Sequence, residues 1–517
     1  MAHQARKQGS ASITGLAIQA PEPTQAEQAA FVTGSNTSPA CTAPANPDHA
    51  LDRPGTPEPW FYTDYHCYGA PQMAAAYGVD QLHSDGLMGA GQTIVLVDSY
   101  GSPTAAHDLG VFHDTYYPGL PAPDFDQVCQ PGCKDYTASN ANGQSGPSAA
   151  EGWAGEANLD IEWSYAMAPL AHIVLVGVPP AETEGVQGFP ALFKMMSSLV
   201  DRYPSGTVFS MSFGVTEQTF GGAAQQQTAK FDQVFKKGLA KGDTFFASSG
   251  DAGTNDVSKQ QRDTRPYPFP VVGWPASSPY VTAVGGTQLM QNWRWDPQSD
   301  QPFNSDGTKN DDYFAWDDTT TTVQPAWNES WLPAATGGGT SVIYPQPSWQ
   351  NGVGPLGGRG LPDVAWDAAV NGGALTYQTF FPQNERAGWH VFGGTSAASP
   401  QVAGLVALLN ERRAEDNGGQ PNPIGFLNRA LYDNGAGTGV GSTAAFSDVT
   451  EQVFGTGIPS GDIKDNGLWG EVDGQAVTPP TVPGMPVTAG WDETTGFGTP
   501  NGPAFVSALE SVPTQTP

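Results

Sequence analysis

Apolar segments of strand length alternate with helical segments through the middle of this chain, and that alternation limits the folds open to it. The candidate strands are residues 93–97, 172–177, 207–212, 244–248 and 280–284, and the candidate helices are residues 155–166, 190–201 and 226–240. This order is typical of a parallel β-sheet, because successive parallel strands need crossover connections. We therefore expect an α/β fold with a parallel sheet flanked by helices on both faces.

A glycine-rich turn runs into an apolar helix near the C-terminus. Residues 393–400 read Gly-Gly-Thr-Ser-Ala-Ala-Ser-Pro, and the apolar stretch 402–410 follows. Glycine lets the backbone approach a substrate closely, and a helix N-terminus offers free N–H groups and a partial positive charge to a developing anion. The setting favours Ser396 as a nucleophile, although Gly-Thr-Ser before a helix is also typical of a simple N-cap.

Two carboxyl groups stand four residues apart within residues 155–163. In a helix this spacing places Glu156 and Asp160 on one face, where like charges repel. Most such pairs are solvated faces. Here the apolar neighbours Leu159 and Ile161 favour burial, and a buried pair has split, coupled pKa values that suit proton transfer.

A third acid follows an apolar run. Residues 248–253 read Ser-Ser-Gly-Asp-Ala-Gly, so Asp251 lies in a loop after a candidate strand, where α/β folds place their chemistry. An ordinary turn would explain Asp251 equally well. A single site that uses Glu156, Asp251 and Ser396 requires one large domain, although the length alone would suggest about three domains of roughly 150 residues.

In this order the three motifs resemble those of the sedolisin family, the serine-carboxyl peptidases, whose catalytic domain is a calcium-bearing relative of the subtilisin fold. Further matching motifs are Ser210 to Gly214 with Glu217, Gly338 to Ser341 before Pro347 and Gln350, Arg359 to Val364, and Gly490 to Asp492 with Thr495 to Gly498. The resemblance covers about residues 68 to 505. Each motif alone is weak, whereas the ordered set is highly specific. It implies a subtilisin-like sheet with a C-terminal calcium-binding loop region.

The resemblance implies a role for four side chains. Ser396 would attack the peptide carbonyl, Glu156 would take the serine proton and later give it to the leaving amine, and Asp160 would orient Glu156. Asp251 would lie in the oxyanion hole, where it can donate a hydrogen bond only while protonated. A free carboxyl group has a pKa of about 4, so we expect an endopeptidase that acts in acid. A tripeptidyl-peptidase with the same site and a noncatalytic calcium-binding homologue are the alternatives.

Asp98, which directly follows the candidate strand 93–97, allows three interpretations. A subtilisin-type enzyme active at neutral pH would use an acid there, but it also needs a histidine at a glycine-rich helix start, and none of the eight histidines has that setting. Within the resemblance, Asp98 corresponds to an acid that in some family members extends the carboxylate network beside Glu156. An acid at a strand end is also a common structural feature.

The resemblance also implies residues that bind substrate. Ser212, Phe213 and Gly214 correspond to a strand that pairs with extended substrate backbone, which by itself gives weak sequence preference. Gly338 and Gly339 would line the opposite edge of the cleft. Endopeptidase and tripeptidyl-peptidase action stay open, because the choice depends on whether a loop closes one end of the cleft.

One calcium ion is implied within residues 446–492. Ca²⁺ prefers hard oxygen ligands. The ligands implied by position are the carboxylates of Asp448 and Asp492 and the carbonyl groups of Val449, Thr488 and Gly490. Thr488 replaces a glycine that is common in the family, and an insertion-like stretch lies between Phe454 and Gly484. Two unrelated surface turns are the alternative.

Acidic residues outnumber basic ones, with 51 Asp and Glu against 21 Lys and Arg and a formal net charge of −30. Protonation removes most of this repulsion at low pH, and few basic groups remain to drive acid unfolding. Any acidic secreted protein could share this composition. The sequence shows no basic patch for nucleic acid and no apolar segment long enough for a bilayer. We expect a secreted, extracellular monomer that acts on protein or peptide substrates.

The two ends of the chain differ from its middle. Residues 1–57 are rich in Ala, Pro, Gln, Thr and Ser, which predicts a flexible extension or a prosegment remnant, and their first residues lack the apolar region of a secretory signal. We expect the peptidase domain at residues 58–512 and a short tail at residues 513–517.

Four cysteines suggest two local disulfides. Cys41 with Cys67 and Cys129 with Cys133 are the predicted pairs, although sequence cannot fix the connectivity. Such bridges would indicate an oxidising location. A zinc site at Cys129 and Cys133 is the weaker alternative, because no second close Cys or His pair accompanies them.

Overall fold

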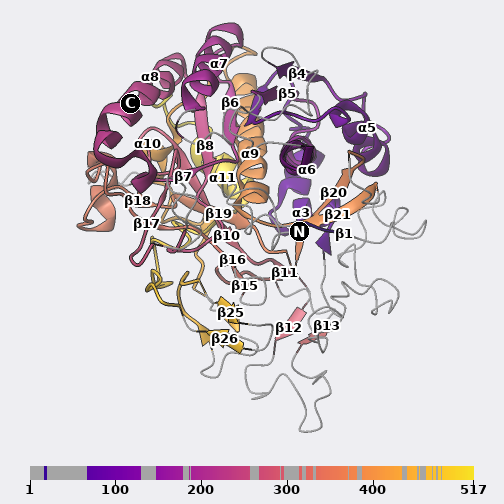
Figure 1. Cartoon of the computed structure of the whole chain (residues 1–517). Coiled ribbons are helices and arrows are strands. Elements are labelled where there is room, and N and C mark those ends of the chain that lie inside the picture. Colours follow the sequence, from indigo (N-terminus) through magenta and orange to yellow (C-terminus); the bar gives the residue numbers. More distant parts are fainter. Residues whose placement is uncertain are drawn as a thin grey trace.

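A computed structural model of the chain is shown in Figure 1. It describes residues 17–19, 67–129, 147–178, 186, 188–256, 267–291, 293–295, 314–316, 322–329, 334–370, 372–380, 387–432, 439–450, 453–454, 462–468, 470–472, 476–478 and 480–517.

A seven-stranded sheet lies at the centre of the fold, and all its neighbouring strands are parallel. In spatial order the strands are β4 (Phe125–Cys129), β5 (His172–Gly177), β3 (Thr93–Asp98), β6 (Val208–Met211), β8 (Thr244–Ser248), β10 (Thr282–Thr287) and β19 (Val364–Asp367). The five predicted strands are confirmed. The edge strands β4 and β19 were not predicted, because the first is half-exposed and polar and the second is only four residues long.

Long helices cover both faces of this sheet (Figure 1). They are α5 (Ala105–Tyr116), α6 (Pro147–Met167), α7 (Phe189–Arg202), α8 (Ala224–Lys241) and α9 (Thr395–Asp416). Neighbouring residues of β6 reveal the two faces, because side chains alternate along a strand. Ser210 Oγ lies 2.8 Å from Ser399 Oγ of α9, whereas Phe209 stacks on Phe245, whose ring contacts Phe235 of α8. Helices α9 and α8 therefore lie on opposite faces.

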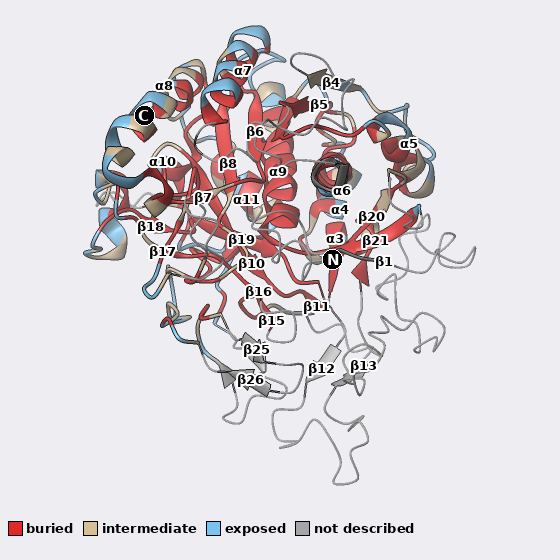
Figure 2. Ribbon diagram, in the orientation of Figure 1, coloured by how far each residue is buried: buried red, intermediate tan, exposed pale blue. Residues whose placement is uncertain are grey.

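Helix α9 is buried on all sides over its first four turns. Every residue from Thr395 to Asn410 is buried, and the helix is red along this length in Figure 2. It packs tightly against α6 at Gly404, where a Cβ atom would lie only 2.5 Å from the Cβ atom of Met167. Only glycine allows the two backbones to come this near, so the acids on α6 are held close to the N-terminus of α9.

The strand register brings three chain segments to one edge of the sheet. Val97 of β3 lies beside Met211 of β6, and Met211 lies beside Ala247 of β8. Because these strands run in parallel, the residues that follow each of them emerge side by side. Asp98, Ser212 and Asp251 therefore come from neighbouring strand ends, which is where α/β folds place functional groups.

A smaller sheet carries the chain to the start of α9. Its spatial order is β1 (Ala17–Gln19), β21 (Gly388–Phe392), β20 (Gly373–Gln378) and β2 (Cys67–Tyr68). Strand β1 lies within the stretch predicted to be a flexible extension, and it pairs antiparallel with β21. The expectation of flexibility therefore does not hold for Ala17–Gln19, whose backbone is paired in a sheet. The other residues of that stretch lie outside the described ranges.

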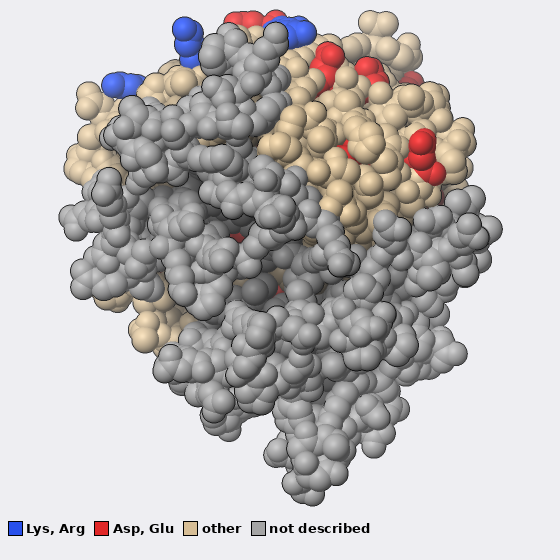
Figure 3. Space-filling model, turned by 45° about the vertical axis from the view of Figure 1, so that its right-hand side comes forward, with Lys and Arg blue, Asp and Glu red and all other residues tan. Residues whose placement is uncertain are grey.

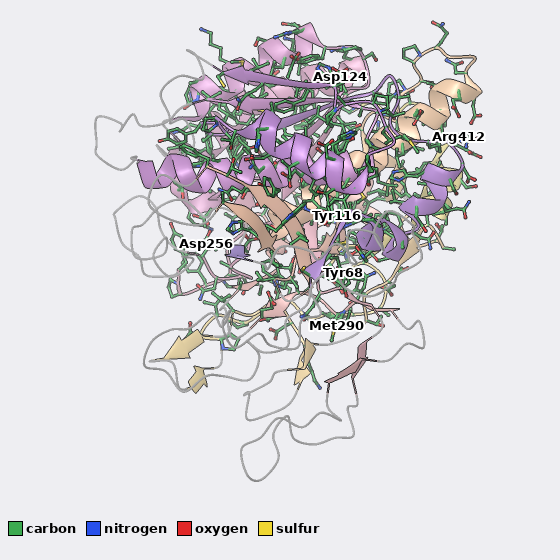
Figure 4. All side chains as sticks on the ribbon, turned by 90° about the vertical axis from the view of Figure 1, so that its right-hand side faces the viewer. Tyr68, Tyr116, Asp124, Asp256, Met290 and Arg412 are labelled. Atoms are coloured by element: carbon green, nitrogen blue, oxygen red, sulfur yellow. The ribbon has the colours of Figure 1, made fainter. Side chains whose placement is uncertain are left out.

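Other contacts tie the N-terminal part of the described chain to the main sheet. Tyr68 of β2 donates a hydrogen bond to the carbonyl oxygen of Leu289. Figure 4 labels Tyr68 and Met290, the residue after Leu289, in the same part of the molecule. Cys67 and Cys129 are not free thiols. The predicted pairing stays a prediction, because Cys41 and Cys133 lie outside the described residues. In the part of the chain that is described, no helix is both long and apolar enough to cross a membrane.

Some acids are buried in the scaffold away from α9. On the face shown in Figure 3, acidic side chains are scattered over the described surface, and the Lys and Arg side chains in view lie at its upper edge. Asp243 and Asp232 are instead buried. Burial raises the pKa of Asp243 to about 7, against the opposing effect of Lys241, and it raises the pKa of Asp232 to about 6. Because both carboxyl groups bind a proton more tightly in the folded chain than in the unfolded chain, their protonation in acid stabilises the folded state relative to neutral pH.

We expect the fold to be more stable at pH 4.5 than at pH 7.5. Between about pH 4 and pH 7 the folded chain binds more protons at Asp243 and Asp232 than the unfolded chain does, so stability falls as the pH rises through this window. For Asp243 the contribution is at most about 4 kcal/mol, since one pKa unit is worth about 1.4 kcal/mol. Thermal unfolding should give a Tm several degrees higher at pH 4.5. Asp243→Asn should reduce this difference, and an unchanged difference would contradict the assignment.

Candidate active site

Ser396 lies in the first turn of α9, immediately after β21. The turn depends on glycine: Gly394 has φ +98°, and a Cβ atom at this position would lie 2.8 Å from Asp251 Oδ2. Pro400 lies inside the helix. Because proline has no N–H group, Pro400 cannot donate the usual helical hydrogen bond to the Ser396 carbonyl oxygen. That oxygen is therefore open to another donor at the beginning of the helix.

Ser212, which follows β6, connects the nucleophile candidate with the acids of α6. Its hydroxyl donates to Asp160 Oδ1 at 2.9 Å and lies 3.5 Å from the Ser396 carbonyl oxygen. All three residues are buried. The structure thus brings Asp160 and Ser396, which are 236 positions apart in sequence, to the two sides of a single hydroxyl group.

Three buried acids form a cluster between the end of β3 and the middle of α6. Asp98, Glu156 and Asp160 are all fully buried. Burial and the charge of Glu156 raise the pKa of Asp98 well above its usual value. Burial, Asp98 and Glu156 also raise the pKa of Asp160, while its hydrogen bond from Ser212 acts in the opposite direction. Three carboxyl groups this close cannot all be ionised, so the cluster holds protons at a pH where free carboxyl groups have lost them.

Asp251 is attached to the residue before Ser396. Its Oδ1 atom accepts hydrogen bonds from the backbone N–H of Thr395 at 2.8 Å and from the Thr395 hydroxyl at 2.9 Å. The same hydroxyl oxygen accepts a hydrogen bond from the Gly250 N–H at 3.0 Å. The Asp251 loop and the start of α9 are thereby locked together. Thr395 was not singled out in the sequence, because its role needs a loop that is 144 residues away.

The residues predicted to bind substrate have different surroundings. The hydroxyl of buried Ser212 donates a hydrogen bond to Asp160. The side chain of Phe213 is buried against Phe189 of α7. Neither side chain therefore lines an open surface. Gly214 is half-buried. What these residues can offer a peptide is backbone, as the resemblance implies.

The opposite predicted edge lies next to the Asp251 loop. Gly339 belongs to β17 (Gly339–Thr340), which pairs with β18 (Gly360–Leu361). Just before it, the Gly337 N–H donates to the Gly250 carbonyl oxygen at 2.7 Å. A Cβ atom at Gly338 would lie 1.9 Å from the carbonyl oxygen of Glu493, so glycine is required for this close packing.

The predicted calcium ligands come together in space. The N–H of Gly490 donates to Asp448 Oδ2 at 2.7 Å, and the N–H of Thr488 donates to Asp492 Oδ2 at 2.8 Å. Asp448 and Val449 therefore meet the turn 488–492. Within the described ranges, no group of three or more His, Cys, Asp or Glu side chains could hold a metal. An ion here would rely on two carboxylates and on backbone carbonyl groups, a donor set that suits Ca²⁺.

The Arg359 to Val364 motif has a structural role. Arg359 and Asp363 form a fully buried ion pair, and Asp363 also accepts hydrogen bonds from the Tyr432 hydroxyl at 2.6 Å and the Ala283 N–H at 2.7 Å. These contacts anchor the end of the sheet at β10 and β19. A buried charge must be paired to be tolerated.

The model of the subtilase family matches residues 155–457, which is more than half of the chain. This chain is a subtilase of the sedolisin type. Among its relatives, kumamolisin from Bacillus sp. (strain MN-32) is 28% identical over 434 residues, which cover 82% of this chain and 61% of kumamolisin. Tripeptidyl-peptidase 1 from Canis lupus familiaris is 30% identical over 374 residues, which cover 68% of this chain and 51% of that protein.

Two further similarities involve sedolisin from Pseudomonas. The sedolisin of Pseudomonas sp. (strain 101) is 36% identical over 203 residues, which cover 39% of this chain and 28% of that protein. A solved structure of Pseudomonas sedolisin, a serine-carboxyl proteinase complexed with two molecules of pseudo-iodotyrostatin, gives a TM-score of 0.59 at 24% identity and covers 87% of this chain and 99% of that chain. This likeness supports the subtilisin-like fold. The sedolisin-type chain spans only 61% and 51% of the lengths of kumamolisin and tripeptidyl-peptidase 1.

We expect Ser212→Ala to raise the pKa of the carboxyl cluster. The variant removes the donor that stabilises ionised Asp160, and a hydrogen bond to a charged group is worth about 1.5–3 kcal/mol, or roughly one pKa unit or more. Infrared spectra that follow the carboxyl C=O band during a pH titration measure the shift. Ser210→Ala is the matched control, because Ser210 is buried in the same part of the sheet but bonds only to Ser399 among the described contacts. Equal titrations in both variants would contradict the prediction.

Proposed function

We propose that this chain is a serine-carboxyl peptidase that cleaves peptide bonds within proteins in acid. The main support is the link through Ser212, whose hydroxyl contacts both Asp160 and the Ser396 carbonyl oxygen. In addition, Thr395 of the same turn donates a hydrogen bond to Asp251. A nucleophile, an acid cluster and a separate acid therefore surround the beginning of one helix. Membership of the sedolisin-type subtilases supports the same reaction.

In the proposed reaction, Ser396 Oγ attacks the substrate carbonyl carbon and its proton passes to Glu156. The C–N bond then breaks, and Glu156 returns the proton to the leaving amine. Water attacks the resulting ester of Ser396 while Glu156 takes the water proton. The ester C–O bond then breaks, Glu156 returns this proton to Ser396 Oγ, and the acid product leaves. Asp160, held by Ser212, orients Glu156, and the negative charge of Asp98 favours the protonated form of Asp160 by raising its pKa.

Asp251 is proposed to stabilise the negative oxygen of the tetrahedral intermediate. Its Oδ1 atom accepts two hydrogen bonds from Thr395, so a proton on Asp251 belongs on Oδ2, the oxygen beside Gly394. Only the protonated form can donate to an oxyanion, and the ionised form would repel it. This requirement favours activity at acid pH.

We expect digestion of an unfolded protein substrate to be fastest on the acid side of a series from pH 3 to 8. Ser396→Ala and Glu156→Gln should each lower kcat by at least about 10⁴-fold, because loss of one residue from a catalytic unit costs nearly as much rate as loss of the whole unit. Ser399→Ala serves as the control, since Ser399 lies in the same buried helix but bonds to Ser210. Full activity of Glu156→Gln at neutral pH would instead favour a subtilisin-type enzyme with a histidine base.

Endopeptidase action is the first choice and tripeptidyl-peptidase action the second. The exopeptidase alternative is supported by the similarity of this chain to tripeptidyl-peptidase 1. The same digests separate the two, because mass spectrometry of early products would show tripeptides only for the exopeptidase. A secreted, extracellular location is part of the proposal, and Cys67 and Cys129, neither of which is a free thiol, are consistent with it.

We also propose that the turn 488–492 and the segment of Asp448 bind one Ca²⁺ ion. The carboxylates of Asp448 and Asp492 and the carbonyl groups of Val449, Thr488 and Gly490 would hold the ion. Its contribution would be structural, because it would bridge two segments that already meet through the Gly490 to Asp448 hydrogen bond, whose partners are 42 residues apart.

Removal of calcium should lower the Tm of the protein, and added Ca²⁺ should restore it. A ligand that binds only the folded state at 100 times its Kd stabilises that state by about 2.7 kcal/mol. Asp448→Asn should weaken binding in isothermal titration calorimetry at least tenfold. Asp416→Asn, an exposed change at the end of α9, should leave binding unchanged. Absence of any calcium-dependent change in Tm would contradict this site.

A further inference from the structure

Asn466 lies in the insertion-like stretch to which the sequence assigned no role, yet it is fully buried. Its amide Nδ2 donates to the Thr336 carbonyl oxygen at 3.0 Å, and its Oδ1 accepts from the Met485 N–H at 2.7 Å. Its backbone carbonyl oxygen accepts from the Thr254 N–H at 3.3 Å. One residue therefore connects three segments that are distant in sequence.

The first of these segments is the Asp251 loop. Gly253 has φ +57°, and a Cβ atom there would lie 2.0 Å from the Asn466 carbonyl oxygen. The Ala335 N–H donates to the Asp251 carbonyl oxygen at 3.1 Å, and the Gly253 N–H donates to the Ala335 carbonyl oxygen at 2.9 Å. The Asn466 carbonyl group thus packs directly against the loop that carries Asp251, and the contact leaves no space for a side chain at Gly253.

The second segment is the glycine edge predicted to bind substrate. Thr336, which accepts the Asn466 amide hydrogen bond, is followed by Gly337, whose N–H donates to the Gly250 carbonyl oxygen at 2.7 Å. The Cβ position of Gly338 lies 3.1 Å from Asn466 Nδ2. Asn466 therefore lies against both segments: its backbone carbonyl group contacts the Asp251 loop, and its side chain contacts the segment that leads to the strand beginning at Gly339.

The third segment leads to the calcium turn. The Met485 carbonyl oxygen accepts a hydrogen bond from the Thr494 hydroxyl at 2.6 Å. The Thr494 N–H in turn donates to Asp492 Oδ1 at 2.9 Å. Three hydrogen bonds therefore connect Asn466 to Asp492, through Met485 and Thr494.

We propose that Asn466 is a positioning residue that fixes the Asp251 loop relative to the Gly338–Gly339 edge of the substrate cleft. The proposal rests on the proposed peptidase function. Because Asp251 acts on the transition state, a small displacement of its loop lowers kcat more than it weakens substrate binding. Misplacement of a catalytic group by about 1 Å can cost on the order of 100-fold in rate.

The amide group suits this position because it is both a donor and an acceptor. Asn466→Leu has a similar size and removes both hydrogen bonds. Asn466→Asp keeps the acceptor for the Met485 N–H, and its carboxyl group can still donate to the Thr336 carbonyl oxygen, but only while it is protonated. Among the described residues, the ionisable groups on the segments packed against Asn466 are Asp251, Asp256, Glu329, Lys464, Asp465, Asp492 and Glu493.

The test compares kcat and KM of the wild type and the two variants on a chromogenic peptide from pH 3 to 7. Asn466→Leu should lower kcat about 10-fold to 100-fold at every pH and change KM by less than about threefold. Asn466→Asp should approach the wild-type kcat near pH 3 and lose activity at lower pH values than the wild type does. A role limited to stability would produce no such pH-dependent rescue in protein that is fully folded.

Asn410 provides the matched control. It is equally buried, its amide donates to the Gly206 carbonyl oxygen, and its Oδ1 accepts from the Ile424 N–H. Asn410→Leu should lower the Tm as Asn466→Leu does, yet keep kcat within about twofold of the wild type at a temperature where both are folded. A normal kcat for Asn466→Leu, or an equal loss in both variants, would overturn the proposal. An inactive wild type, or activity that survives Ser396→Ala, would instead refute the peptidase function.

Discussion

The packing of α9 through the centre of the molecule is the constraint on which the other features depend. Its first four turns are buried against the neighbouring strands and helices, and Gly404 lets α6 approach it at backbone contact. Since Ser396 is in the first turn of α9 and Asp160 is on α6, their approach through Ser212 follows from this contact. A side chain at Gly404 would separate the two helices and, with them, the groups of the site.

Burial of acids is the second organising property of the fold. Removing an ionised carboxylate from water is costly unless it is paired or protonated. Asp98 and Asp160 are buried beside Glu156 and have raised pKa values, and Asp232 and Asp243 of the scaffold behave in the same direction. The proposed chemistry and the stability of the fold are therefore favoured by the same condition, a low pH at which Asp232, Asp243 and part of the carboxyl cluster are protonated while Glu156 can still accept a proton.

Much of this arrangement could be predicted because it depends on local pattern. The five apolar strands and the helices near residues 155, 190 and 226 were all found, since burial on both faces imposes runs of apolar residues. The edge strands β4 and β19 have no such pattern. Thr395 and Asn466 could not be assigned roles, because the roles are defined by hydrogen bonds to Asp251, Thr336 and Met485, which lie far away in sequence.

By itself the sequence determined the class of fold and the candidate residues Ser396, Glu156, Asp160 and Asp251, through residue types at spacings that each segment carries alone. The tertiary structure decided which groups meet. Ser212 contacts both Asp160 and Ser396, and Thr395 donates hydrogen bonds to Asp251. Asn466 contacts both the Asp251 loop and the segment that leads to the glycine edge. The physical reason is that helix and strand periodicity is a short-range property. A hydrogen bond between distant segments exists only after packing has fixed the backbones to within a few tenths of an ångström.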